Sequence, residues 1–246
     1  MAAWWVEVPR DFVRVTGPDA RVYLQGQLSQ DVDALQVGDS AFSFILQPQG
    51  KVDAYLRVTR VEDAYVLDVD AGWGEALVAR LARFKLRTKA DIELLADWRC
   101  VAIVSDDGAV TERVGADVAV EGAEGDPLDY EVLRIKAGVP RMGSEIDETT
   151  IPASLGVVDR SVSFTKGCYT GQELVARIDS RGGKTPTRLV GVRGATNPDD
   201  TLVIDGREVG RITSAQGDVA LAFLRRDVAL PATADGGLAL EPLPLP

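Results

Sequence analysis

The chain has 246 residues, of which 46% are apolar and 26% charged, which is enough for one large domain or two to three small ones and excludes global disorder. It contains no histidine, which excludes Ser-His-Asp hydrolysis, zinc sites with histidine ligands and a histidine general base. Its two cysteines are too few for a disulfide framework or a single-chain four-thiolate cluster. The net charge of -11 argues against a nucleic-acid partner, because neutralisation of phosphates dominates that affinity.

The N-terminal segment predicts neither a signal peptide nor a membrane anchor. Met1–Glu7 lacks a basic region, and Glu7 interrupts its apolar run. Elsewhere no apolar run approaches the roughly 18 residues that a membrane-spanning helix needs. We therefore expect a cytoplasmic protein of a reducing compartment, with no membrane among its partners.

The first part of the chain mixes strand and helix patterns without a regular repeat. Strand patterns occur at 12–16, 41–46, 52–58, 65–69 and 101–104. A turn at Pro48-Gln49-Gly50 joins the second of these to the third. Helices are predicted from Gly17-Pro18-Asp19 through Leu24, over 75–84 and over 130–137. The second helix leads into a strand, and the third ends before Gly138 and Pro140. This mixed order favours an α+β fold over a βαβ repeat.

The C-terminal part has a different texture. After residues 182–186, short strand patterns separated by turn residues occur at 189–192, 202–204, 209–213 and 219–224. Short strands at this spacing are typical of a small all-β barrel or sandwich. The proline-rich ending, 242–246, is expected to be merely a terminus.

Charge is unevenly distributed along the chain. Residues 106–131 contain nine acids and one arginine, whereas residues 159–193 contain seven basic residues and three acids. A local basic region in an acidic protein is compatible with a small anionic ligand, because a large polyanion would be repelled. Both stretches can equally be ordinary solvated faces.

One segment carries reactive groups in a suggestive order: Lys166-Gly167-Cys168-Tyr169-Thr170-Gly171-Gln172-Glu173. Thr170, followed three residues later by Glu173, has the spacing of a capping box. The sequence therefore predicts a helix that begins after Thr170 and ends near Gly182.

This helix would place Cys168 in the turn before its N-terminus. Free amide groups, the helix dipole and the nearby Lys166 would all favour a thiolate, the form that ligates metals and attacks electrophiles. The glycines of the segment would let backbone approach a ligand closely. The alternative is that Cys168 is a small buried hydrophobe, which is what the apolar strand around Cys100 predicts for that second cysteine.

The segment Lys166 to Glu173 resembles the signature of the YgfZ family, the folate-binding proteins of iron-sulfur cluster maintenance that are related to the glycine-cleavage T-protein. The resemblance covers most of the chain and is densest over 130–189. Further matching stretches are Val15–Val32 with Gln25-Gly26-Gln27 and Asp31, Gly50-Lys51, Leu133–Pro140, Ile151-Pro152, Ser163-Phe164 and Glu241-Pro242-Leu243.

The resemblance implies an α+β fold: two α+β folate-binding sub-domains over residues 1–185 and a small C-terminal β-barrel over 186–246, arranged as a three-lobed ring around a channel for tetrahydrofolate. It implies that Cys168 is the functional thiol and that Gly171 helps to shape the channel. The residues that it assigns to folate are Tyr130, Lys166, Gly167, Tyr169, Gln172, Glu173 and Arg177. Tyr130 would stack on the pterin, and the basic region would meet the glutamate carboxylates of the folate.

The implied function is a tetrahydrofolate-binding factor in iron-sulfur cluster assembly or repair, including under oxidative stress. One accessible thiol cannot hold a cluster or a stable metal in one chain without outside ligands. We therefore expect Cys168 to act transiently with iron-sulfur client or assembly proteins. We also expect a monomer.

Two other functions stay open, and so does the question whether the protein is an enzyme. The first is a folate-dependent aminomethyl or one-carbon transferase, in which a carboxylate such as Asp53 would handle a proton. Against it, Ala54 follows Asp53 where the T-protein carries its catalytic aspartate. The second is a thiol redox sensor or scaffold that has lost the ligand, because Lys136 and Ala153 also depart from the family pattern.

Overall fold

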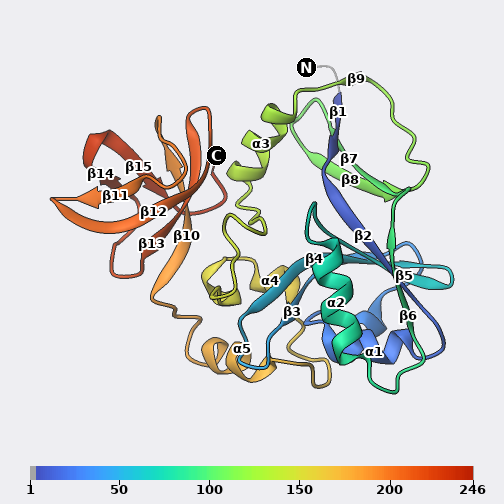
Figure 1. Ribbon diagram of the computed structural model, residues 1–246. Helices are drawn as coiled ribbons and strands as arrows, with labels where there is room; N and C mark the ends of the chain where they lie inside the picture. The colour runs from blue at the N-terminus through green and yellow to red at the C-terminus, as the bar shows by residue number, and fades with distance from the viewer. Residues whose placement is uncertain (1–3, 246) are drawn as a thin grey trace. The chain divides into compact units, whose positions relative to one another are not determined.

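The computed structural model describes residues 4–245, so Met1–Ala3, on which part of the signal-peptide prediction rests, lie outside the described residues. The chain divides into two compact units, both drawn in Figure 1. One unit comprises Met1–Pro48, Asp53–Tyr130 and Arg160–Gln172. The other comprises Gln49–Val52, Glu131–Asp159 and Glu173–Pro246.

The first unit contains two sheets. The order of the larger sheet is β3 (Ser40–Leu46), β4 (Val52–Val61), β5 (Ala64–Asp70), β2 (Arg10–Thr16), β6 (Asp91–Leu95). The order of the smaller sheet is β8 (Val110–Gly115), β7 (Arg99–Val104), β1 (Trp4–Val8), β9 (Ala123–Glu124). In the larger sheet β2 pairs antiparallel with both β5 and β6, and in the smaller one β1 pairs antiparallel with β7.

The two sheets of the first unit share a hydrophobic core. Side chains alternate along β2, so that Phe12 and Val13 face opposite sides of the larger sheet although both are buried. Phe12 packs with Val8 and Cys100 from the smaller sheet, and its ring lies 6.0 Å from that of Trp98. Cys100 is fully buried in β7, which confirms the prediction for this cysteine.

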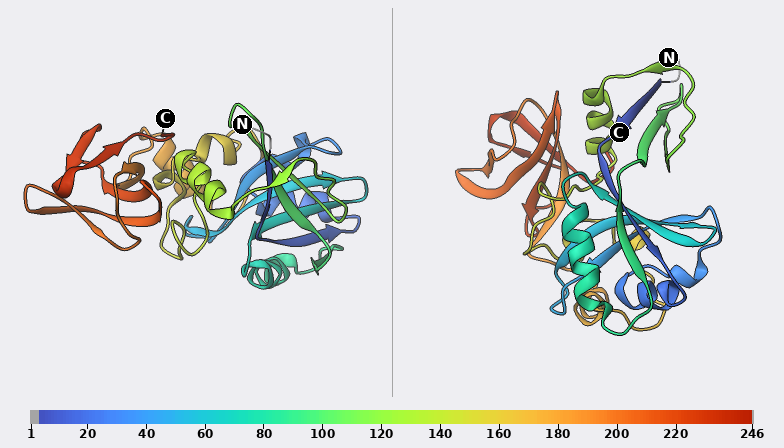
Figure 2. Two further views of the ribbon diagram at one scale, coloured as in Figure 1. Left: turned by 90° about the horizontal axis from the view of Figure 1, so that it is seen from above. Right: turned by 45° about the vertical axis from the view of Figure 1, so that its right-hand side comes forward.

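Two helices complete the first unit. Helix α1 (Ala20–Gln27) and helix α2 (Gly74–Lys85) touch where the Tyr23 hydroxyl donates a hydrogen bond of 2.5 Å to the carbonyl of Leu81. Leu77 and Leu81, one turn apart, are the buried leucines of α2, as the helical spacing predicts. The helix lies alongside β6, as the right view of Figure 2 shows.

The second unit contains a nearly closed six-stranded barrel. Its strand order is β11 (Thr201–Ile204), β12 (Arg207–Gln216), β13 (Val219–Arg225), β10 (Thr187–Arg193), β15 (Leu238–Glu241), β14 (Ala232–Ala234). The two end strands, β11 and β14, contact each other, and the left view of Figure 2 shows the curled strands. Alternating apolar residues such as Val190, Val192 and Leu224 fill the interior.

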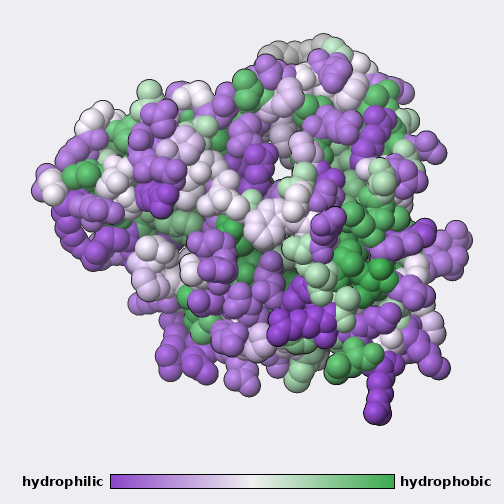
Figure 3. Space-filling view, viewed as in Figure 1, coloured by the Kyte–Doolittle hydropathy of each residue, from purple (hydrophilic) through white to green (hydrophobic). Residues whose placement is uncertain are grey.

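Hydrophilic side chains line the outer edge of the barrel in Figure 3. Exposed ion pairs join Arg207 to Asp227 and Arg211 to Asp199 on this unit. The barrel therefore has an apolar interior and charged groups on its outer surface.

Helix α3 (Pro127–Lys136) packs on the barrel through its C-terminal half, where Ile135 contacts Leu221 and Leu245. The Leu245 N–H also donates to the carbonyl of Lys136 at 2.7 Å. Leu245 is 6% exposed, so the prediction that 242–246 is merely a terminus is wrong for this residue. Its side chain packs in one apolar cluster with Ile135 of α3 and Leu221 of β13.

The remaining elements are short: η1 (Val32–Ala34), η2 (Pro152–Ser154), α4 (Val158–Ser161), α5 (Gln172–Asp179) and η3 (Asp235–Gly237). Within residues 4–245, no helix is long and apolar enough to span a membrane. The structure confirms the α+β fold with a C-terminal barrel. The three-lobed ring and the 185/186 boundary stay predictions.

Candidate functional site

The segment that carries Cys168 is fastened to the end of α1. The N–H of Ser163 donates to the carbonyl of Ser29 at 3.0 Å, and the N–H of Thr170 donates to the carbonyl of Gly26 at 3.1 Å. These bonds lie on either side of Cys168 in the sequence. The backbone around the thiol therefore has two fixed ends.

Lys166 holds the segment between these two bonds. Its Nζ donates to three backbone carbonyls, those of Gln25 at 2.7 Å, Leu28 at 2.7 Å and Gln30 at 2.8 Å. Carbonyls at the C-terminal end of a helix lack intrahelical partners and carry the negative end of the dipole, so an ammonium group is stabilised there. Burial lowers the pKa of Lys166 to about 8, while the charges of Asp31 and Asp33 oppose that shift.

Tyr169 and Gln172 complete this cluster. The Tyr169 side chain is buried, its ring centre lies 5.3 Å from the Lys166 ammonium, and burial raises the pKa of its hydroxyl to about 12. Its N–H donates to Oε1 of Gln172 at 3.1 Å. The structure thus brings together Lys166, Tyr169 and Gln172 beside Cys168: Lys166 ties the segment to the end of α1, and Gln172 accepts from the backbone of Tyr169.

Cys168 itself is exposed, so the alternative that it is a buried hydrophobe is wrong. Gly167, beside it, is exposed as well. Cys100 is the opposite case, because burial raises the pKa of its thiol to about 12 and keeps it protonated. Of the two thiols, only that of Cys168 is open to solvent and presented by a fixed backbone.

Helix α5 follows the cluster and begins at Gln172, one residue later than the capping-box pattern predicts. Gly171, just before it, has a φ of 79°, a conformation that favours glycine. The helix ends at Asp179, where the N–H of Gly183 donates to the carbonyl of Ile178 at 2.9 Å, close to the predicted end.

Glu173 and Arg177 lie on α5 within the second unit. Both side chains are exposed, and among residues 4–245 no ion pair joins them. Their charged groups are therefore accessible to a ligand from solvent.

Gly171 and Gly167 provide a matched pair of substitutions in this segment. Gly171→Ala is expected to lower the free energy of unfolding by about 1–2 kcal/mol, because alanine is strained at positive φ. A Cβ at Gly167 would meet nothing within 4 Å, so Gly167→Ala should leave stability nearly unchanged. Urea unfolding followed by tryptophan fluorescence measures both, and equal effects of the two substitutions would contradict the assignment.

Tyr130 lies in a different part of the first unit. Its hydroxyl donates to Oε1 of Glu112 at 2.5 Å, and its ring packs against the core between the two sheets. Burial and the Glu112 charge raise the pKa of this hydroxyl. No contact joins Tyr130 to the Cys168 segment within the described part of the chain.

A buried ionic network, which the sequence interpretation missed, begins at Glu112. Oε2 of Glu112 accepts from Arg57 at 2.7 Å, and Arg57 in turn pairs with Asp68 at 2.9 Å. Asp68 also binds Arg10 at 2.8 Å. The sequence contains one signal: in β5, Asp68 lies two residues after the buried Val66, so alternation places this carboxylate on an apolar face.

The network opens to one side. Arg57 and Glu112 line a cavity of about 790 Å³ in the first unit, together with residues of β4, β8 and the loop after β8. The Ser40 and Thr59 hydroxyls, which also line it, are hydrogen-bonded to each other at 2.9 Å.

Other residues singled out from the sequence are placed as follows. Asp53 forms an ion pair of 2.6 Å with Arg80, which also stacks on the ring of Phe84, and Ala54 is buried. Lys136 lies in the last turn of α3, and Ala153 lines a cavity of about 160 Å³ beside α5. Among residues 4–245, no group of three or more Cys, Asp or Glu side chains is arranged to hold a metal ion.

Comparison with known proteins identifies the family. Residues 186–244 match the family described as CAF17, C-terminal beta-barrel domain. The glycine cleavage system aminomethyltransferase T of Bartonella henselae has a similar fold, with a TM-score of 0.76 and 18% identity over 99% of this chain and 86% of that one. The tRNA-modifying protein YgfZ of Edwardsiella ictaluri is 27% identical over 69% of this chain and 65% of its own length. The chain belongs to the YgfZ/CAF17 family.

The likeness to the aminomethyltransferase structure is one of fold. Another relative of this YgfZ/CAF17 protein is the mitochondrial iron-sulfur cluster assembly factor IBA57 of Mus musculus, 27% identical over 89% of this chain and 76% of that protein. An uncharacterized protein of Haemophilus influenzae is 30% identical over 69% of this chain. The chain spans 66% of the Haemophilus protein, just under two thirds of its length.

Proposed function

We propose that this YgfZ/CAF17 protein binds a tetrahydrofolate and acts in iron-sulfur cluster assembly or repair, with the Cys168 thiol as its functional group. The observation that carries the proposal is the exposed Cys168 on a segment fixed by Lys166. The name of the IBA57 relative, an iron-sulfur cluster assembly factor, supports the process.

A single fixed thiol suits the handling of a cluster that belongs to another protein. A thiolate is a strong iron ligand, but Cys100 is buried and supplies no second one. Cys168 would therefore bind the cargo together with ligands from a client or assembly protein and then release it. A preformed backbone around the thiol lowers the ordering cost of that transient bond.

Some of the residues present can contact tetrahydrofolate directly, and others can shape its site. Arg177, exposed on α5, has the guanidinium that pairs with glutamate carboxylates, and the exposed Glu173 has a carboxylate that can accept from pterin N–H groups. Lys166 and Tyr169 are engaged in fixing the segment, so we assign them and Gly167 the shaping of the site. Gln172 would offer its amide N–H, and Tyr130 the face of its ring.

Titration with tetrahydrofolate tests the ligand. We expect heat of binding and a higher midpoint of thermal unfolding, since a ligand at about 100 times its Kd stabilises the folded state by about 2.7 kcal/mol. Arg177→Gln should weaken binding about tenfold, because it removes a charge-assisted hydrogen bond. Arg87→Gln, at an exposed arginine just beyond α2 and outside the basic region 159–193, is the control. Absence of heat with the unmodified chain would exclude folate as a ligand.

The likeness in fold to aminomethyltransferase T keeps a folate-dependent aminomethyl or one-carbon transferase as the second candidate. The carboxylate that would transfer the proton is Asp53, which already forms an ion pair with Arg80. The next residue, Ala54, is buried and has no carboxylate. We therefore expect no methylene-tetrahydrofolate from the purified protein, tetrahydrofolate and an aminomethyl donor. Steady turnover would favour the transferase instead.

A further inference from the structure

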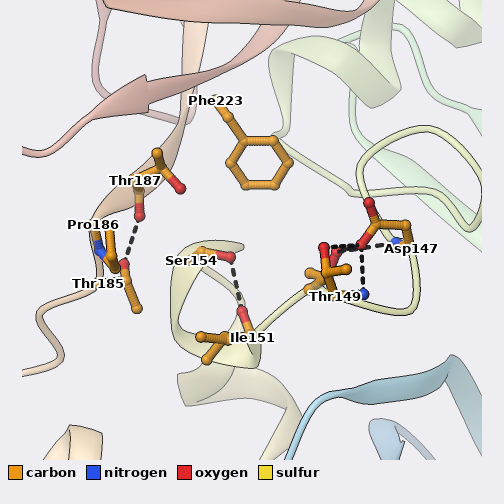
Figure 4. Close-up of a pocket in the computed structure, with 9 residues that line it drawn as sticks. Asp147, Thr149, Ile151, Ser154, Thr185, Pro186, Thr187 and Phe223 are labelled. Atoms are coloured by element: carbon orange, nitrogen blue, oxygen red, sulfur yellow. Dashed lines mark hydrogen bonds between the residues drawn. The ribbon is translucent and has the colours of Figure 1, made fainter.

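A separate cavity lies wholly within the second unit, between the loop that precedes η2 and the start of β10 (Figure 4). Its volume is about 340 Å³, at the lower end of the range for small-molecule sites. The Phe223 ring lies over it, and Asp147 lies at one side. The lining residues are Asp147, Thr149, Thr150, Ile151, Ser154, Thr185, Pro186, Thr187 and Phe223.

Most hydroxyl protons of this cavity are already used inside the protein. Thr149 and Thr150 both donate to Oδ1 of Asp147, at 2.7 and 2.9 Å. The Ser154 hydroxyl donates to the carbonyl of Ile151 at 2.8 Å, and that of Thr185 donates to the carbonyl of Thr187 at 2.5 Å (Figure 4). These four oxygens consequently offer a ligand only their lone pairs.

The backbone of the loop repeats this pattern. The N–H of Thr149 donates to Asp147 Oδ1, the N–H of Asp147 donates to the Thr150 hydroxyl, and that of Ser154 donates to the carbonyl of Ile151. Pro186 has no N–H to offer. The lining is therefore rich in acceptors and poor in donors.

The charge of the cavity has one sign. Asp147 is the one charged residue among the lining residues, and hydrogen bonds from Thr149 and Thr150 lower the pKa of its carboxyl, which stays ionised at neutral pH. The hydrogen bonds that the Thr149 and Thr150 side chains and the Thr149 N–H make to this carboxylate all end on Oδ1. The Phe223 ring adds a face that attracts cations.

We propose that this cavity binds an alkyl guanidinium or primary ammonium group. Such a group supplies several donors to the free lone pairs, a positive charge to Asp147 and a cation to the Phe223 ring. An anion would meet a carboxylate and no compensating cation. The same chemistry is offered by a free amine metabolite and by an arginine side chain of a bound protein.

The test uses the full chain and agmatine as the probe, with calorimetry and thermal unfolding as the readouts. Asp147→Asn keeps the Oδ1 acceptor of the loop but replaces Oδ2 with an amide donor, so agmatine binding should weaken at least about tenfold. Phe223→Leu should weaken it several-fold. Glu208→Gln, which removes an exposed charge of the same unit away from the cavity, should leave binding unchanged.

Two further measurements distinguish a free small molecule from a protein side chain as the source of the cation. Tighter binding of agmatine than of a glycine-arginine-glycine amide peptide would indicate a free small molecule, and the reverse order would indicate a protein side chain. Either order supports the proposal if Asp147→Asn abolishes the preference for the cation. No binding at millimolar agmatine, equal binding by Asp147→Asn, or preferential binding of glutarate would overturn it.

Discussion

Asp68→Asn is expected to lower the free energy of unfolding of the first unit by about 3–5 kcal/mol, the cost of leaving buried charges without their partner. Asp68 is fully buried, and its carboxylate accepts from Arg57 at 2.9 and 3.2 Å and from Arg10 at 2.9 Å. Asparagine has the same shape but no negative charge. The guanidinium groups of Arg57 and Arg10, whose side chains are 9% and 13% exposed, would then each lose a carboxylate that balances their positive charge.

Chemical denaturation followed by tryptophan fluorescence measures this effect, because Trp98 packs in the adjacent core. Asp33→Asn is the control: it removes the same charge from an exposed pair with Arg21 in the same unit and should cause little change. A loss below about 1 kcal/mol for Asp68→Asn would show that the network is not electrostatically important.

Lys166→Met is expected to lower the free energy of unfolding by about 2–3 kcal/mol, since it removes three short bonds from a charged donor and leaves the half-buried carbonyls without it. Lys166→Arg should not restore the loss, because a planar guanidinium cannot direct its protons at three converging carbonyls as an ammonium group does.

Hydrogen exchange adds a local readout for this substitution. The amides of Ser163 and Thr170, which donate to the loop at the end of α1, should exchange faster in Lys166→Met than in the unmodified chain. Lys89→Met, at an exposed lysine of the same unit, is the control for loss of a charge. Unchanged exchange of both amides would mean that Lys166 does not fix the segment.

Local patterns were sufficient for much of the fold. The apolar runs at 12–16 and 65–69 predict β2 and β5, which are buried on both faces, and the leucine spacing at 75–84 predicts α2, which buries one face. The short strand patterns after Pro186 predict a small all-β domain, either a barrel or a sandwich, and the family resemblance implied the barrel that the structure shows. Helix α5 was predicted to within one residue of its start.

What escaped prediction depends on partners far away in the sequence. The acceptors of Lys166 lie 136 to 141 residues before it, and Arg57 and Glu112 are 55 residues apart. β15 carries little strand pattern of its own and is held by pairing with β10 and β14. Patterns in a single sequence do not contain such long-range contacts. The sequence therefore predicts Lys166 as a cation beside the thiol and a folate ligand, but it does not predict the backbone carbonyls that Lys166 binds.

The role of Cys168 is tested most directly by the activity of iron-sulfur enzymes, under oxidative stress, in a strain that lacks its own family member and expresses variants of this chain. Cys168→Ser should fail to restore that activity although its unfolding midpoint is unchanged, because the thiol is exposed and makes no core contact. Cys100→Ala, at the buried thiol, should restore it. Full restoration by Cys168→Ser would contradict the account, since the one accessible thiol would then have no part in the function.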